Sequence, residues 1–186
     1  KQNANAVVRL DQMDIVIASQ RNMNIKTQRV VSVLNEKGLN DIDAYAHYDK
    51  TTSIKSIEAV VYDALGNEIK KIRKKEFRDQ SAVSGSTLFS DNRVLYLDYT
   101  PISYPFTIVY TCETETSNTA FIPQWYFLSA YNLSVEKCVL NVTFPKELGF
   151  KKKEFRFEGF NIKKTADTDT NLSYTATNIV AQKQED

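Results

Sequence analysis

The sequence predicts an all-β protein, an antiparallel β-sandwich of about ten strands. The composition is rich in Val, Ile and Thr and includes ten Tyr and ten Phe, which are residue types enriched in strands. Apolar residues recur with a period of two, and turn residues separate these stretches at the spacing typical of sandwiches. No stretch keeps a 3.6-residue period over three turns. We therefore expect at most one helical turn, in residues 40–47.

The N-terminal third contains two short expected strands, 6–10 and 14–18, and a long one, 23–34. One face of the long strand carries Met23, Ile25, Thr27, Arg29, Val31 and Val33. The opposite face is polar at first and becomes apolar toward Leu34, so we expect a half-buried strand whose far end is buried on both sides. A turn at 35–38 follows.

The clearest hairpin joins the expected strands 54–63 and 68–72. Its connection contains Gly66 and Asn67, which both tolerate the positive φ that tight hairpin turns require. A lysine-rich stretch, 70–75, follows, and a second one lies at 151–153. Glutamates flank both stretches, so we interpret them as solvated edge strands protected by lysine rather than as a phosphate-binding surface.

The remaining expected strands are 94–99, 106–116, 133–144, 154–164 and 172–181. Pro101 and Pro105 force the chain out of the sheet between the first two, because proline lacks the amide donor of a ladder. A small, polar loop is expected at 81–86, and a turn at 167–171. Because no linker or repeat is visible, we expect one β-sandwich domain spanning 1–186.

Composition excludes several classes of function. The net charge is +1, so no overall field favours nucleic acid, and no apolar run approaches the ~20 residues of a membrane span. The five glycines form none of the nucleotide-binding or hydrolase motifs. The 167–171 turn resembles the start of a calcium loop but lacks its glycine and final glutamate. We expect no cofactor and no metal.

The residues that could perform catalysis are few. A nucleophilic thiol needs a base within reach, and the only histidine is His47. Cys112 and Cys138 both fall within expected strands, where we interpret them as small buried hydrophobic residues, and a disulfide between them stays an alternative. An enzyme would need His47 beside one of the two thiols. We therefore expect no catalytic residues in this chain.

The region from 96 to 127 concentrates aromatic residues next to three of the four prolines. Aromatic rings in connections can fill the open end of the core, form a docking face for another domain, or make a platform for sugars or peptides. The candidate interaction surface consists of Tyr99, Tyr104, Phe106, Phe121, Trp125 and Tyr126.

Three segments resemble a known family. They are 90–106 (SDNRVLYLDYTPISYPF), 118–125 (NTAFIPQW) and 61–69 (VYDALGNEI). The family consists of uncharacterised domains that stand N-terminal to transglutaminase-like domains in exported proteins of Bacteroidota, and the resemblance covers about 8–160. It implies a longer periplasmic, cell-surface or secreted protein whose downstream domain holds a papain-like Cys-His-Asp site. It implies no functional residues in this module.

These observations lead to two hypotheses. The first is a non-catalytic N-terminal accessory domain of a transglutaminase or cysteine-peptidase-like exported protein, which docks to the downstream domain or presents substrate to it. The alternative is a free-standing module of the cell envelope that binds a glycan or a peptide.

Overall fold

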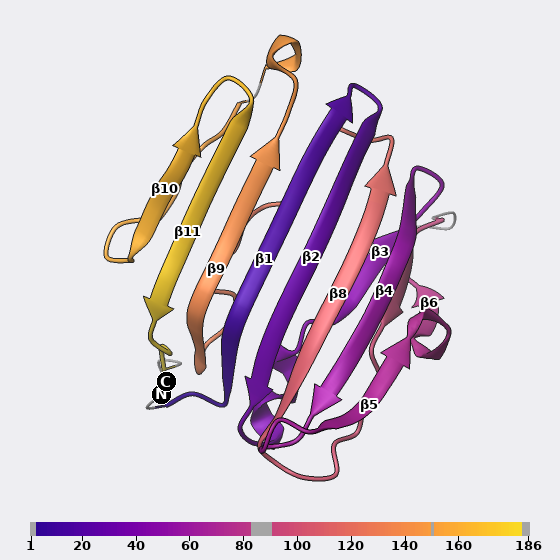
Figure 1. Cartoon of the computed structure of the whole chain (residues 1–186), viewed down its shortest axis with the longest axis vertical. Coiled ribbons are helices and arrows are strands. Elements are labelled where there is room, and N and C mark those ends of the chain that lie inside the picture. Colours follow the sequence, from indigo (N-terminus) through magenta and orange to yellow (C-terminus); the bar gives the residue numbers. More distant parts are fainter. Residues whose placement is uncertain (1–2, 83–90, 150, 184–186) are drawn as a thin grey trace.

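The computed structural model describes residues 3–82, 91–149 and 151–183, and these residues form two β-sheets (Figure 1). The strands are β1 (Ala6–Ser19), β2 (Asn22–Val33), β3 (Tyr45–Tyr48), β4 (Thr52–Tyr62), β5 (Glu68–Arg73), β6 (Arg78–Ser81), β7 (Arg93–Tyr96), β8 (Phe106–Thr116), β9 (Leu133–Thr143), β10 (Ile162–Asp167) and β11 (Asn171–Ile179). Three short 3-10 helices complete the described elements: η1 (Glu36–Asp41), η2 (Lys74–Glu76) and η3 (Lys146–Leu148).

The large sheet has eight strands in the order β10-β11-β9-β1-β2-β8-β4-β5, and the small sheet has the order β3-β7-β6. In Figure 1 the small sheet lies behind β4 and β8, and its buried side chains join the same hydrophobic cluster as those of the large sheet. The expected all-β, sandwich-like fold is therefore confirmed. The face of the large sheet that the small sheet covers is called the inner face below.

Two features of β1 differ from expectation. The two expected short strands are one strand of 14 residues, which continues through an irregularity between Val8 and Leu10. In addition, β1 pairs with β9 in parallel, whereas the other pairs are antiparallel. Parallel neighbours need a long crossover. Here residues 117–132, which we call the crossover, lead from the end of β8 back to the start of β9.

The small sheet was not fully foreseen. The helical turn expected in 40–47 is wrong: the 3-10 helix η1 ends at Asp41, and β3 occupies residues 45–48. Strand β6 was not predicted, and residues 154–161 lie outside any strand, so β10 begins only at Ile162. Strands β3 and β6 have only four residues each, which is too few to show an alternation of apolar and polar residues in the sequence. Both strands pair with β7, and strand formation depends on such tertiary contacts. Most of the expected 81–86 loop lies outside the described residues.

The hairpin between β4 and β5 is as expected, with Gly66 at a φ of +87°. Strand β5 forms one edge of the large sheet and β10 the other, and both carry exposed lysines. The interpretation of the 70–75 stretch as a lysine-protected edge is thus supported by strand order. The same interpretation is wrong for 151–153, because these residues lie outside any strand. No helix in the described residues is long and apolar enough to cross a membrane.

The core on the inner face is divided into two hydrophobic clusters. The first includes residues from the starts of β1 and β9, the end of β2, the lengths of β4 and β8, and the small sheet; Val31, Ile108 and Leu133 are among them. The second lies toward the opposite strand ends and includes Ile15 and Met23. Between them, side by side on the inner face, stand the paired residues Asp11 and Arg29.

Candidate functional site

The candidate surface residues between β7 and β8 do not all reach the surface. Phe106 is the first residue of β8 and only 2% exposed, so its place on the expected interaction surface is corrected: it belongs to the core. Its ring supports Tyr99 edge-on, with ring centroids 5.8 Å apart, and Tyr104, with centroids 5.6 Å apart. Tyr99 is half-buried and Tyr104 is exposed.

The other three candidates lie in the crossover, which spans the inner face. Phe121 and Tyr126 are 79% and 64% exposed, whereas Trp125 is half-buried. Trp125 packs against Tyr174 of the sheet, whereas its neighbour Tyr126 faces solvent. The crossover thus both covers the core and presents rings outward.

Trp125 is the centre of a cluster of rings, which we call the aromatic cluster. Its members are Trp125, Phe127, Phe157, Phe160 and Tyr174. The Trp125 ring stacks on Tyr174 of β11 with centroids 5.8 Å apart, and its Nε1–H donates to Cys138 Sγ at 3.1 Å. Residues that come from the crossover, from 157–160 and from β11 are therefore fastened together by ring contacts.

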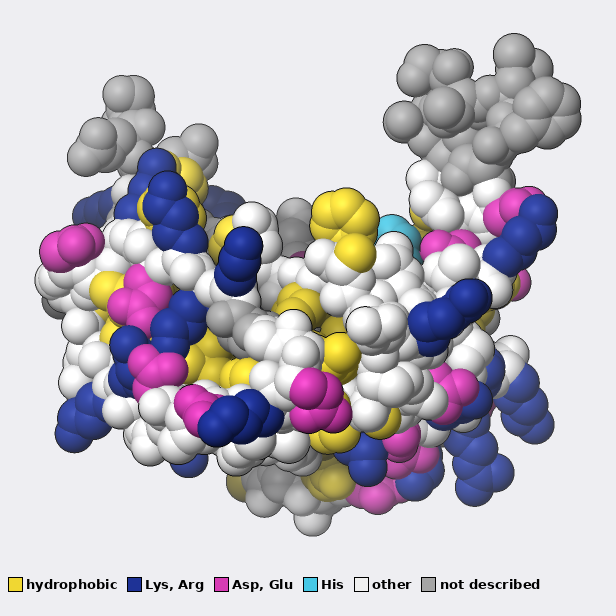
Figure 2. Space-filling model, turned by 90° about the horizontal axis from the view of Figure 1, so that it is seen from above, with side chains coloured by type: hydrophobic (Ala, Val, Ile, Leu, Met, Phe, Trp, Pro, Cys, Tyr) yellow, Lys and Arg dark blue, Asp and Glu magenta, His cyan; other side chains and the backbone are white. Residues whose placement is uncertain are grey.

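The two thiols are separate and buried. Cys138 of β9 and Cys112 of β8 are separated by β1 and β2, which amounts to three strand spacings, or about 14 Å. A disulfide needs Cα atoms within about 7 Å, so the disulfide alternative is wrong and both cysteines are free. His47 stands exposed on β3, and as the only histidine it is the cyan side chain at the surface in Figure 2.

Burial makes both thiols unreactive. It raises the pKa of the Cys112 thiol and raises that of Cys138 to about 12. Since the thiolate is the reactive form, we expect iodoacetamide to modify neither cysteine in the folded protein and both in guanidinium-unfolded protein, as measured by mass spectrometry. Glutathione in the same tube controls for reagent activity. Rapid modification of either cysteine in the folded chain would contradict this assignment.

A buried ion pair that sequence reasoning missed lies at the centre of the inner face. Arg29 is 6% exposed, and its Nη1 pairs with the carboxylate of Asp11 on the neighbouring strand. Its Nε donates to the Ile42 carbonyl at 3.1 Å, and its Nη2 donates to the Asp41 carbonyl at 3.0 Å and to Asp43 Oδ2 at 3.2 Å. We call Arg29, Asp11 and residues 41–43 the arginine clamp. It fastens the link between η1 and β3 to the large sheet.

The arginine clamp contains three acidic side chains, Asp11, Asp41 and Asp43, but only one basic side chain, Arg29. Burial raises the pKa of Asp11 against the opposing effect of Arg29. Burial, and secondarily the charge of Asp43, raises the pKa of Asp41 to about 6. The signal that could have revealed the clamp was a single arginine on the apolar face of the 23–34 alternation.

Asp41 makes stability depend on pH. Its pKa is higher in the folded than in the unfolded chain, so the folded state holds the proton more tightly, and the resulting stabilisation is lost as pH rises from about 4 through about 6. We expect Asp41→Asn to unfold with a free energy about 1 kcal/mol higher at neutral pH, after allowance for the solvent screening of this half-exposed group.

Urea denaturation at about pH 4 and at neutral pH measures this effect. The gain should shrink toward zero at the lower pH, where Asp41 of the wild type is itself protonated. Asp169→Asn, at an exposed site away from the clamp, is the matched control. An Asp41→Asn gain of equal size at both pH values would contradict the assignment.

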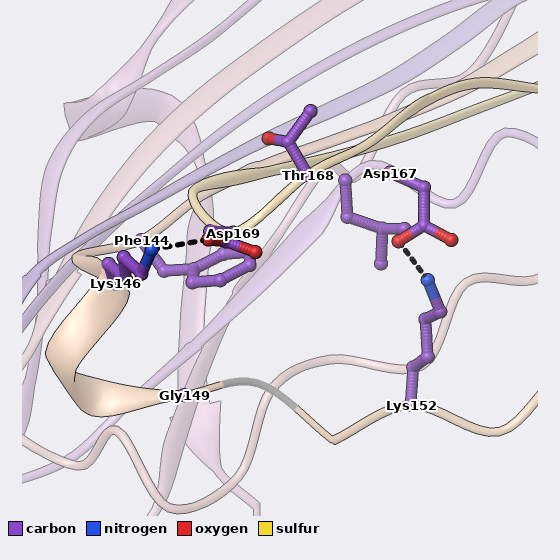
Figure 3. A pocket seen from close by; sticks show the side chains of 8 residues that line it. Phe144, Lys146, Gly149, Lys152, Asp167, Thr168 and Asp169 are labelled. Carbon is purple, nitrogen blue, oxygen red and sulfur yellow. Dashed lines mark hydrogen bonds and ion pairs between the residues drawn. The ribbon is translucent and has the colours of Figure 1, made fainter.

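A pocket of about 300 Å³ lies where the turn between β10 and β11 approaches η3 (Figure 3). It is lined by Phe144, Lys146, Gly149, Lys152, Asp167, Thr168, Asp169 and Leu172. Lys146 Nζ lies 2.6 Å from Asp169 Oδ2, and Lys152 pairs with Asp167. Since each lysine already has a carboxylate partner, Lys146 fastens the turn to η3, and Lys152 fastens it to the segment after η3. Figure 2 shows the same mixing of positive and negative side chains on this end of the molecule.

No group of three or more His, Cys, Asp or Glu side chains among the described residues could hold a metal ion.

Comparison with known proteins identifies the family of this chain. A family model described as DUF3857, a domain of unknown function with a solved structure, matches residues 20–183. The chain belongs to the DUF3857 family. No curated protein matches this DUF3857 chain.

Among solved structures, the DUF3857 chain is similar to a protein from Parabacteroides distasonis that is described as a presumed protease. The TM-score is 0.68 at 11% identity, over 97% of this chain and 37% of that one. An M1 zinc metallopeptidase from Deinococcus radiodurans matches at 8% identity and a TM-score of 0.33, over 94% of this chain and 39% of that one, which is too remote for any argument. The first likeness shows a shared fold, and the chain spans little more than a third of the Parabacteroides protein.

Proposed function

We propose that this DUF3857 chain is a non-catalytic accessory domain of a longer exported protein, and that it docks to, or presents substrate to, a downstream transglutaminase or cysteine-peptidase-like domain. The fold of this chain is similar to a region that makes up about a third of a Parabacteroides protein described as a protease, and this supports association with such an enzyme. The resemblance of the 90–106 and 118–125 segments supports the transglutaminase-like partner and a periplasmic, cell-surface or secreted location in Bacteroidota.

The observation that carries the proposal is the outward presentation of Phe121 and Tyr126. Both rings are largely exposed, although the crossover that bears them is anchored by Trp125 in the aromatic cluster. Exposed aromatic residues on an anchored backbone can be buried by a partner at little conformational cost, and aromatic residues dominate the binding energy of interfaces. A docking role explains this exposure, whereas a core-covering role requires only Trp125 and Phe127.

Backbone hydrogen bonds join the end of the crossover to the C-terminal part of the described chain. The Asn132 amide donates to the Gln182 carbonyl at 2.7 Å, and the Asn5 amide donates to the Asn132 carbonyl at 2.7 Å. A domain that follows residue 186 would therefore begin beside the end of the crossover. The exposed Tyr131 lies in the same stretch and extends the proposed docking surface.

The non-catalytic part of the proposal is supported by the chemistry of the candidate nucleophiles. Burial raises the pKa of both thiols, and each is enclosed in the hydrophobic core. His47 is exposed on the small sheet. A nucleophile and its base would have to meet in one accessible cleft.

Hydrogen exchange tests the docking. Amide exchange in 119–131 should slow in a polypeptide that carries the proposed downstream domain after residue 186, compared with the 186-residue chain. Phe121→Ser with Tyr126→Ser should abolish this difference. Leu65→Ser, on the exposed hairpin tip between β4 and β5, is the matched control and should leave it unchanged. Equal exchange of 119–131 in both polypeptides would rule out docking at this surface.

A further inference from the structure

A second pocket, of about 270 Å³, lies beside the small sheet and away from the aromatic cluster. It is lined by Leu39, Asn40, Ile42, Asp43, Ala44, Tyr45, Tyr96, Leu97, Asp98 and Tyr99. Its walls are η1, the start of β3 and the chain that continues from β7, and the Leu97 amide donates to the Ala44 carbonyl at 2.9 Å. Three tyrosines and three polar side chains of the Asp and Asn type therefore converge on one opening.

The walls of this pocket are held in place from both sheets. The hydroxyl of Tyr110, in the large sheet, donates to the Tyr45 carbonyl at 2.8 Å, and the arginine clamp holds residues 41–43. Tyr99 rests against the buried Phe106 ring. The pocket is thus largely formed before any ligand arrives, which lowers the conformational cost of binding.

The charges of the pocket limit the class of ligand. Both of its carboxylates already have cationic partners, because Asp43 Oδ2 accepts from Arg29 at 3.2 Å and Asp98 pairs with Arg78. A cationic ligand would gain little from carboxylates that are already neutralised. No lysine, arginine or histidine lines the pocket, so an anionic ligand would find no counter-charge.

The remaining chemistry favours a neutral, hydroxyl-rich ligand. Asp43 and Asp98 keep free lone pairs that accept hydrogen bonds from hydroxyl groups, and the Asn40 amide can both donate and accept. The hydroxyls of Tyr96 and Tyr99 make no hydrogen bond to any other described residue and can pair with a ligand. Tyrosine rings supply the apolar surface that the carbon faces of a sugar ring require.

We propose that this pocket is a subsite for a neutral saccharide unit of a glycan. Its volume lies just below the roughly 300–1,000 Å³ of typical small-molecule sites, which suits one or two sugar rings. The pocket and the proposed docking surface share no exposed ring, so saccharide binding does not depend on the downstream domain.

Nuclear magnetic resonance titration of the 186-residue chain tests this subsite. The probes are cellohexaose, xylohexaose, mannohexaose and chitopentaose as neutral oligosaccharides, a tetragalacturonate as the anionic arm, and a tetralysine peptide as the cationic arm. We expect at least one neutral oligosaccharide to shift the amide signals of 39–45 and 96–99, with a dissociation constant of about 1 mM or below.

Two variants locate the binding. Tyr45 is 49% exposed, so Tyr45→Ala should keep the fold and weaken binding about tenfold. Asp98→Asn retains the shape of the side chain and should weaken binding about threefold or more. Leu65→Ala, on the exposed hairpin tip between β4 and β5, is the matched control and should bind like the wild type.

The following results would overturn the proposal: no neutral oligosaccharide shifts these amides, or Asp98→Asn and Tyr45→Ala both bind as tightly as Leu65→Ala. Binding of the galacturonate or lysine probe alone would overturn the neutral-saccharide class. If Tyr45→Ala alone lowers the melting temperature, the Asp98→Asn comparison decides. Failure here leaves the hydrogen-exchange test of docking unaffected.

Discussion

Replacing Arg29 by Met should lower the free energy of unfolding by about 3–5 kcal/mol, the cost of leaving a buried charge without its partner. Arg29 is the only cation that contacts the buried Asp11 carboxylate among the described residues, and it also satisfies the carbonyls of Asp41 and Ile42. Its loss should release the link between η1 and β3 and expose an uncompensated negative charge between the two hydrophobic clusters. Urea denaturation followed by circular dichroism measures the effect.

The matched control for this variant is Arg9→Met. Arg9 pairs with Glu136 on the outer face, where both side chains are more than one-third exposed, so its replacement should cost no more than about 1 kcal/mol. Adding Asp11→Leu to Arg29→Met should restore part of the loss, because the unpaired carboxylate is then absent. The loss in Arg29→Met should also shrink in acid, since protonation of Asp11 removes the same charge. A cost below about 1 kcal/mol would show that the clamp is not structural.

Trp125→Ala should be the second most damaging change, with a loss of about 3 kcal/mol. The side chain is half-buried, stacks on Tyr174 and contacts Phe127 and Phe157, so truncation leaves a cavity inside the aromatic cluster. It also removes the donor to Cys138 Sγ. Because Trp125 is the only tryptophan, unfolding must be followed by circular dichroism rather than by fluorescence.

The neighbouring Tyr126 provides the comparison. Tyr126→Ala removes an exposed ring and should change the free energy of unfolding by no more than about 0.5 kcal/mol. The contrast has a practical consequence: Trp125→Ala cannot serve as a binding variant, because lost binding would be confounded with lost stability. Equal costs for the two substitutions would contradict the inward orientation of Trp125.

Local alternation was sufficient for much of the fold. The bounds of β8 agree with the expected 106–116, and β2, β4, β5, β9 and β11 lie within one or two residues of the expected strands. The turn residues Gly66 and Asn67 specified the hairpin, and the lysines identified β5 as an edge. These features depend on neighbours in the sequence, which is why a single sequence reveals them.

The candidate surface was only partly predictable. Aromatic residues beside prolines correctly indicated a segment outside the strands, but the sequence did not show that Phe106 and Trp125 turn inward while Phe121 and Tyr126 turn outward. That division depends on which sheet face the crossover spans. The direction of the crossover follows in turn from the parallel pairing of β1 with β9.

By itself, the sequence determined that the chain is all-β, where most of its strands lie, and that it has few groups suited to catalysis. The tertiary structure decided the order of the strands, the formation of β3 and β6, the separation of the two thiols, and the meeting of Arg29 with Asp11 and residues 41–43. The physical reason is range: a period of two follows from the geometry of one strand, whereas these contacts join residues distant along the chain and exist only once the sheets have assembled.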